Sequence, residues 1–225
     1  MKFIKYGITL KRITKDDMET IRQWRNSKEI RNQMQFRGYI TKNMQNKWFH
    51  SIDNINNFYY IIIYKDEQIG LFNEKNIDWE HKTSETGLFI AEKKYINTQI
   101  PVLTSLFLSE IGFYLLQGER TYIRILKDNH QAIKYSRSFG YELCENQDDQ
   151  ELQQYVLTRQ HFENKGKKLL DAANKIYKEN AVLWLYLEEH DYQSGVAQFI
   201  ENIIDRSELK IQFDVIDGVK RYHFP

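Results

Sequence analysis

The spacing of apolar residues near the start of the chain predicts a short strand followed by two helices. Residues 8–13 alternate apolar and polar side chains, as a half-buried strand does. Thr14 and Asp17 have the spacing of a capping box, and the apolar positions after them recur every three residues. We therefore expect a helix to begin there and a second helix over 41–51.

The middle of the chain changes from strand to helix periodicity. Aromatic and β-branched runs at 58–64, 69–77 and 84–91 are separated by short polar turns, which predicts an antiparallel meander. Residues 100–116 then carry apolar side chains at helical spacing, with Pro101 in the first turn. Gly118 is expected to end this helix as its C′ residue.

Short elements alternate from here to residue 158. We expect strands over 122–126, 141–143 and 154–158, and a helix over 129–138. The predicted order is therefore β, α, α, β, β, β, α, β, α, β, β, which indicates an α+β fold.

The composition changes after Arg159, so we divide the chain into a domain at 1–160 and a C-terminal α/β extension at 161–225. Helices are expected over 169–177 and 196–204, and Asp217-Gly218 predicts a hairpin. The apolar run 181–187 fits a buried strand or part of a helix, because periodicity does not distinguish the two.

Charge and composition narrow the function classes. The 225 residues are 41% hydrophobic and 28% charged, yet the formal net charge is +1. No strong overall field attracts nucleic acid or an anionic membrane, so neither is an expected partner. Cys144 is the one cysteine, which we read as an apolar filler, and no apolar run is long enough to span a bilayer. We expect a cytoplasmic protein.

Common catalytic motifs are absent from the sequence. The six histidines have no i, i+4 pair, and one cysteine does not complete a zinc set, so no metal is expected. Glycine-rich phosphate motifs and the GxSxG nucleophile motif are also missing.

Three segments together carry a resemblance to a known family. They are Leu10-Lys11-Arg12-Ile13-Thr14-Lys15-Asp16-Asp17 with Trp24-Arg25-Asn26 and Ile30, then Glu85-Thr86-Gly87-Leu88-Phe89-Ile90, then Asn129-His130-Gln131-Ala132-Ile133 with Phe139-Gly140-Tyr141. In this order, residues 8–158 resemble the GNAT acetyltransferase superfamily. Within it they look most like the branch of ribosomal-protein N-terminal and nucleotide-activated amino-sugar acetyltransferases.

The resemblance implies a GNAT-like mixed central sheet that splays open and is flanked by helices. In this family the pantetheine arm of acetyl-CoA bonds to free backbone groups of the strand at the opening. Those groups map to Leu88, Phe89 and Ile90. Unpaired amides of this strand can also hold a developing oxyanion, so no covalent intermediate is implied.

The expected pyrophosphate loop departs from the family pattern of Gln/Arg-x-x-Gly-x-Gly/Ala. Thr98 and Ile100 stand where small residues are expected, and Pro101 removes one amide donor. The remaining candidates for binding coenzyme A are Asn97, Thr98 and Gln99, assisted by Lys93 or Lys94. Asn129 matches a family position that contacts the same ligand.

The candidate acid and base follow from the same resemblance. Glu85 is our first candidate for the base that deprotonates the amine, although it is also readable as a solvent-facing strand residue. His81 is the second candidate base, and its alternative is a polar turn residue. Ser136 stands where many members have the tyrosine that protonates the thiolate, and Tyr135 is its neighbour. Arg25 is a candidate acceptor-binding residue, alternatively a partner for a carboxylate, whereas Trp24 is assigned to the core.

Two functions from different classes remain at this point. The first is an acetyl-CoA-dependent N-acetyltransferase acting on a small polar amine, such as an amino sugar, or on a protein N-terminus. The second is a GNAT-like domain without activity that serves as a binding or oligomerisation module, which the missing glycines favour. A homodimer is a further expectation.

Overall fold

A single mixed sheet organises the protein. The computed structural model describes residues 1–207, 209, 211–216 and 218–224. In spatial order the eleven strands are β10 (Gln212–Ile216), β11 (Val219–Phe224), β9 (Leu183–Leu187), β1 (Lys2–Lys5), β2 (Ile8–Arg12), β3 (Phe58–Tyr64), β4 (Glu67–Asp78), β5 (Thr83–Ile90), β6 (Arg120–Leu126), β8 (Leu152–Thr158) and β7 (Glu142–Leu143). Among the described residues, β5 and β6 form the one parallel pair.

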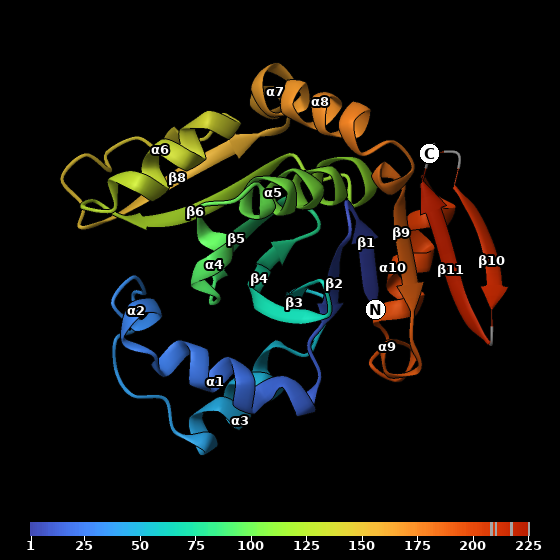
Figure 1. Ribbon diagram of the computed structural model, residues 1–225, viewed down its shortest axis with the longest axis horizontal. Coiled ribbons are helices and arrows are strands. Elements are labelled where there is room, and N and C mark those ends of the chain that lie inside the picture. Colours follow the sequence, from blue (N-terminus) through green and yellow to red (C-terminus); the bar gives the residue numbers. More distant parts are fainter. Residues whose placement is uncertain (208, 210, 217, 225) are drawn as a thin grey trace.

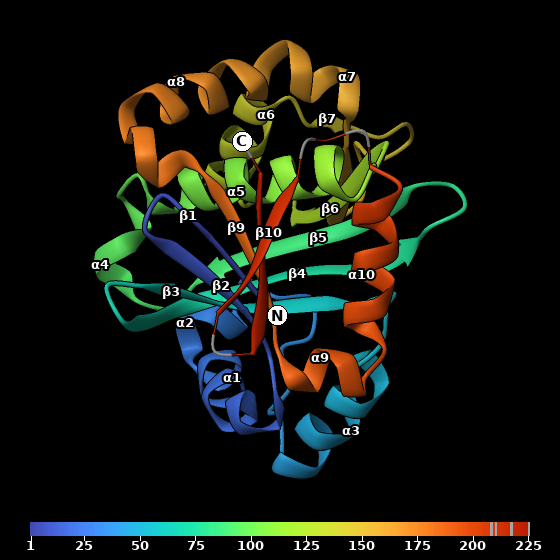
Figure 2. The same ribbon diagram turned by 90° about the vertical axis from the view of Figure 1, so that its right-hand side faces the viewer.

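Helices cover both faces of this sheet (Figures 1 and 2). One face carries α1 (Met18–Asn26), α2 (Lys28–Arg31) and α3 (Lys42–Ile52). The opposite face carries α5 (Ile100–Glu110), α6 (His130–Phe139), α7 (Arg159–His161) and α8 (Lys167–Tyr177). The short α4 (Lys93–Ile96) precedes α5, and α9 (Glu189–Gln193) and α10 (Val196–Asp205) belong to the extension. The predicted fold, an open mixed sheet flanked by helices, is confirmed.

Two apolar clusters hold the layers together. A smaller cluster joins α1 to the sheet through Met18, Ile21, Tyr59, Ile61 and Leu71. A larger cluster fills the face under α5 and continues into the extension. Because successive strand residues face opposite sides of a sheet, β3 and β4 contribute to both clusters.

One predicted helix begins with the expected cap, and another ends differently from the prediction. Asp17 accepts a hydrogen bond from the Thr14 amide at 2.8 Å, so the capping box is present. The helix expected over 100–116 is α5 followed by a π-helical segment, Ile111–Leu115. Gly118 is not its left-handed residue, because Gln117 takes that conformation with φ of 56°.

The C-terminal extension continues the same sheet. The ambiguous run at 181–187 forms strand β9, which pairs with β1 on one side and β11 on the other. We did not predict β1, and its four residues supply the edge on which the extension is built. The predicted hairpin forms between β10 and β11; Gly218 has φ of 77°, and Asp217 lies outside the described residues.

The extension also packs on the rest of the chain through side chains. The rings of Trp79 and Phe199 lie 4.6 Å apart, centroid to centroid, and so join the end of β4 to α10. Across residues 1–207 and the described remainder, no helix combines the length and the apolar character needed to cross a bilayer.

Candidate active site

Strands β5 and β6 separate near the middle of the sheet. Their parallel pairing covers Thr83 to Glu85 and ends where Glu85 meets Tyr122. Strand β5 nevertheless continues to Ile90 and stays paired with β4 on its other edge. Beyond Glu85 the β6-facing edge of β5 therefore carries backbone groups that the sheet does not pair.

The register with β4 decides which backbone groups face this opening. The Ala91 amide donates to the Ile69 carbonyl at 2.7 Å, so Ala91 and, two residues earlier, Phe89 direct their backbone groups toward β4. An added Cβ on Gly70 would lie 2.3 Å from the Phe89 carbonyl oxygen, which explains the glycine there. The N–H and C=O groups of Leu88 and Ile90 consequently point into the opening.

A large cavity runs through this opening. Its volume is about 1500 Å³, above the roughly 300–1,000 Å³ of most small-ligand sites. Ten of the predicted site residues line it: Arg25, Glu85, Leu88, Phe89, Ile90, Lys93, Thr98, Asn129, Tyr135 and Ser136. The volume is sufficient for two substrates side by side.

On the α1 face the cavity is cationic. Arg25 makes no ion pair with any described residue, and its Nε is buried without a hydrogen-bond partner. Burial lowers the pKa of this guanidinium. Asn73 lies over Gly87, whose added Cβ would be 2.9 Å from the Asn73 Oδ1, and the Asn73 Nδ2 is also unpartnered. This face thus offers free hydrogen-bond donors.

Glu85 lies on the same face and is already paired. Its carboxylate contacts the Lys75 Nζ at 2.8 Å and the Arg124 Nε at 3.3 Å, and its side chain is 14% exposed. It is therefore not the solvent-facing residue considered as an alternative. Lys75 contacts its Oε1 and Arg124 contacts its Oε2, so both carboxylate oxygens already face a cation.

In the loop before α5, three of the candidate side chains already have partners. The Thr98 hydroxyl donates to the Tyr95 carbonyl at 2.8 Å and accepts from the Ile100 amide at 3.2 Å. Lys93 pairs with Glu29 of α2 at 2.9 Å, and Lys94 pairs with Glu67. Asn97 and Gln99 are exposed and do not line the cavity.

The α6 candidates sit on the other side of the opening. Asn129 caps α6, its Oδ1 accepting from the Ala132 amide at 3.1 Å. The Tyr135 hydroxyl donates to the Pro101 carbonyl at 2.8 Å and is hydrogen-bonded to Ser105, so it ties α6 to α5; burial raises its pKa. Ser136 is buried at the cavity wall.

His81 does not line the cavity between β5 and β6. Its side chain is 71% exposed in the turn between β4 and β5, where its Nδ1 contacts the Asp78 carboxylate at 2.7 Å. It lines a separate depression with Glu119 and Arg159. The structure does not bring it to the other predicted residues.

A half-buried glutamate at the same opening was not among the predicted site residues. Glu74 of β4 accepts a hydrogen bond from the Ser84 hydroxyl at 2.9 Å, and no described cation pairs with it. Burial raises its pKa to about 7. Its position two residues after Phe72 was the available signal, because strand alternation puts both on the buried face.

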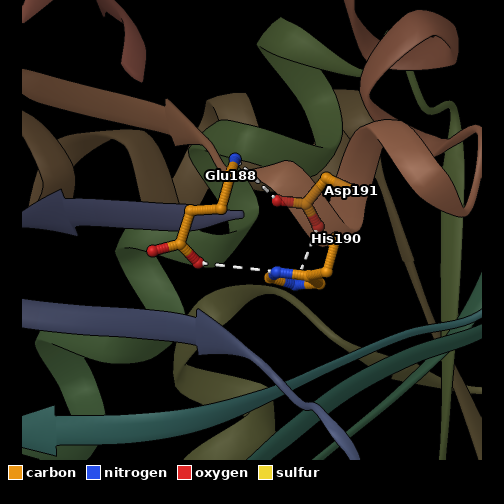
Figure 3. Close-up of side chains that lie close together, drawn as sticks. All are labelled: Glu188, His190 and Asp191. Carbon is orange, nitrogen blue, oxygen red and sulfur yellow. Dashed lines mark hydrogen bonds and ion pairs between the residues drawn. The ribbon is translucent and has the colours of Figure 1, made fainter. Parts of the chain in front are cut away.

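A second cluster of potential ligands lies in the extension, where Figure 3 shows Glu188, His190 and Asp191 close together. Their charges are already matched: Lys2 pairs with Glu188 at 2.5 Å, Arg12 pairs with Asp191 at 3.1 Å, and the Met1 amino group contacts both carboxylates. Three cations facing two carboxylates make this a structural charge cluster rather than a cation site.

A family model matches the sequence, and solved structures share the fold. A family model described as an acetyltransferase (GNAT) domain matches residues 10–154. No curated protein matches the chain in sequence.

Solved structures share the fold at low identity. Spermidine N-acetyltransferase from Vibrio cholerae, in complex with CoA and spermine, is 15% identical with a TM-score of 0.62; the match covers 70% of this chain and 99% of that one. A domain from Methanocaldococcus jannaschii is 20% identical with a TM-score of 0.58, over 67% and 97% of the two chains. A dodecameric form of the Vibrio cholerae enzyme matches similarly, at 13% identity and a TM-score of 0.57, over 70% and 97%.

Proposed function

Because the chain belongs to the GNAT acetyltransferase family, we propose that it transfers the acetyl group of acetyl-CoA to a primary amine. The observation that carries this proposal is the opening between β5 and β6, where Leu88 and Ile90 present unpaired backbone groups to a cavity of about 1500 Å³. An amide-rich arm can satisfy such groups as an added strand does.

The residues at the opening fit acetyl-CoA. Leu88 and Ile90 would hold the pantetheine arm, and the first turn of α5 with Thr98 would face the phosphates. When bound, acetyl-CoA supplies an activated acyl group. The chain itself holds the amine beside this group and keeps donors directed at the oxygen where negative charge develops.

We propose that the acceptor carries an oxygen-rich or anionic group next to its amine, as an amino sugar or a similar small polar acceptor does. Arg25 and Asn73 offer unpartnered donors on the α1 face. Lys75 and Arg124 share one carboxylate, that of Glu85, so positive charge is in excess there. A polyamine would meet like charge here. The branch that includes nucleotide-activated amino-sugar acetyltransferases fits this chemistry.

Acetyl transfer is tested with acetyl-CoA and three acceptor probes: an amino-sugar phosphate, spermidine and a short peptide with a free N-terminus. Mass spectrometry of the products reads out the transfer. We expect acetylation of the amino-sugar phosphate and less of spermidine. Preference for spermidine would reject the anionic acceptor, and transfer to none of the probes would reject the activity.

The second candidate is an oligomerisation module, favoured by an exposed apolar edge. Strand β10 pairs with β11 alone among the described residues, and Phe213, Val215 and Ile216 are exposed on it, Phe213 at 63%. Such edges pair readily with another chain. Size-exclusion chromatography with light scattering tests self-association: we expect a dimer or larger species that Val215→Lys dissociates, whereas a wild-type monomer would contradict it.

A further inference from the structure

Glu74 ends a continuous chain of hydroxyl groups. The Ser84 hydroxyl lies 2.9 Å from the Glu74 carboxylate and 3.2 Å from the Thr121 hydroxyl. Thr121 lies 3.3 Å from Thr86, whose hydroxyl is 3.4 Å from that of Tyr141. We call Ser84, Thr121, Thr86 and Tyr141 the hydroxyl chain.

The hydroxyl chain ends where the strands part. Thr121 and Ser84 are partners in the last stretch of β5–β6 pairing, and Thr86 is the first residue of β5 beyond it. Tyr141 lines the cavity, as do the other members and Glu74. A hydroxyl group has one proton to donate and two lone pairs that accept, and its O–H bond rotates, so a chain of hydroxyls can pass a proton in either direction.

Among the residues that the structure describes, no charged side chain pairs with Glu74. The titratable groups facing it are Tyr60 from β3 and Tyr141, and burial raises the pKa of both. From the helix side it faces Gly112, whose added Cβ would lie 3.7 Å from the Glu74 Oε1. Desolvation is the cause of the raised pKa of Glu74, and a carboxyl that titrates near neutrality is suited to proton exchange.

We propose that Glu74, through the hydroxyl chain, takes up the proton that the attacking amine loses and returns it to the departing sulfur. This inference rests on the proposed function. The nitrogen forms a bond to the acetyl carbon as the carbon–sulfur bond breaks. Nitrogen gives up one proton and sulfur gains one, so Glu74 ends the cycle ionised, as it began. Tyr141 is the group that meets the reacting atoms, and Glu74 acts through it.

The test compares Glu74→Gln with the matched control Glu85→Gln on the neighbouring strand. The first measurement is thermal unfolding without ligand from pH 5 to pH 8. A carboxyl whose folded pKa is raised stabilises fully below its unfolded pKa, and this contribution is lost as pH rises through about 7. We therefore expect the melting temperature of Glu74→Gln, relative to the wild type, to rise by several degrees from pH 5 to pH 8. The relative melting temperature of Glu85→Gln should not rise over this range.

The second measurement is the pH profile of kcat/KM with acetyl-CoA and whichever probe the wild type acetylates. We expect a wild-type ionisation near pH 7 that Glu74→Gln removes, with kcat about 10²-fold lower and KM for the acceptor little changed. Glu85→Gln should keep the ionisation.

The outcomes separate the two proposals. Wild-type transfer with an unchanged profile in Glu74→Gln, or a melting difference independent of pH, would overturn the proton role alone. Absence of transfer by the wild type would reject the proposed function, and the proton role would fall with it.

Discussion

Glu74 and Glu85 lie on neighbouring strands at the same opening, yet their surroundings are opposite. Glu85 is on the α1 face between Lys75 and Arg124, which stabilise its negative charge. Glu74 faces the π-helical segment after α5; its partner is the Ser84 hydroxyl, and burial raises its pKa to about 7. One sheet therefore holds, at the same opening, a carboxylate paired with two cations and a carboxylate hydrogen-bonded to a hydroxyl.

Cutting the hydroxyl chain at its cavity end gives the largest expected effect. Tyr141→Phe removes the hydroxyl that lies 3.4 Å from Thr86, so we expect kcat to fall about 10²-fold. Because Tyr141 and Glu74 act as a unit, the double variant with Glu74→Gln should lose little more than either single variant. Fully additive losses in steady-state kinetics would show that the two residues act independently.

On the α1 face, Arg25 is expected to contribute to acceptor binding. A hydrogen bond to a charged group contributes about 1.5–3 kcal/mol, so Arg25→Met should raise KM for an anionic acceptor about 10- to 100-fold. Arg25→Lys keeps the charge and should retain part of the affinity. The free energy of unfolding should change little, because Arg25 makes no ion pair with the described residues and its Nε has no hydrogen-bond partner to lose. Tighter acceptor binding by Arg25→Met would contradict the anionic acceptor.

The smallest effect is expected at Glu85. Its removal frees Lys75 and Arg124, and partly exposed ion pairs contribute about 0.2–1 kcal/mol. Glu85→Gln should therefore change kcat a few-fold, and stability in urea by less than about 1 kcal/mol. A kcat loss as large as that of Glu74→Gln would return the role of base to Glu85.

Local patterns were sufficient to predict much of the fold. The aromatic and β-branched runs of β3 and β5, the capping box of Thr14 and Asp17 and the hairpin at Gly218 depend on residues close in sequence. Strand β1 was missed because four residues carry too little periodicity, and its second partner, β9, lies about 180 positions away.

The site was predictable where a motif marked it and not elsewhere. Leu88 and Ile90 follow from the strand at the opening, although the register that directs Phe89 toward β4 required the structure. Glu74 was missed because its contacts come from separate segments, with Ser84, Thr121 and Tyr141 meeting only in the folded chain. His81 is local to its turn and was indistinguishable in sequence from a residue at the site.

Acetyl-CoA binding at the opening between β5 and β6 is the central claim, and thermal unfolding with and without acetyl-CoA tests it most directly. At about one hundred times the dissociation constant, binding to the folded state should add roughly 2.7 kcal/mol and raise the melting temperature by several degrees. Free CoA should act in the same direction. An unchanged melting temperature with both ligands at millimolar concentration would contradict the account.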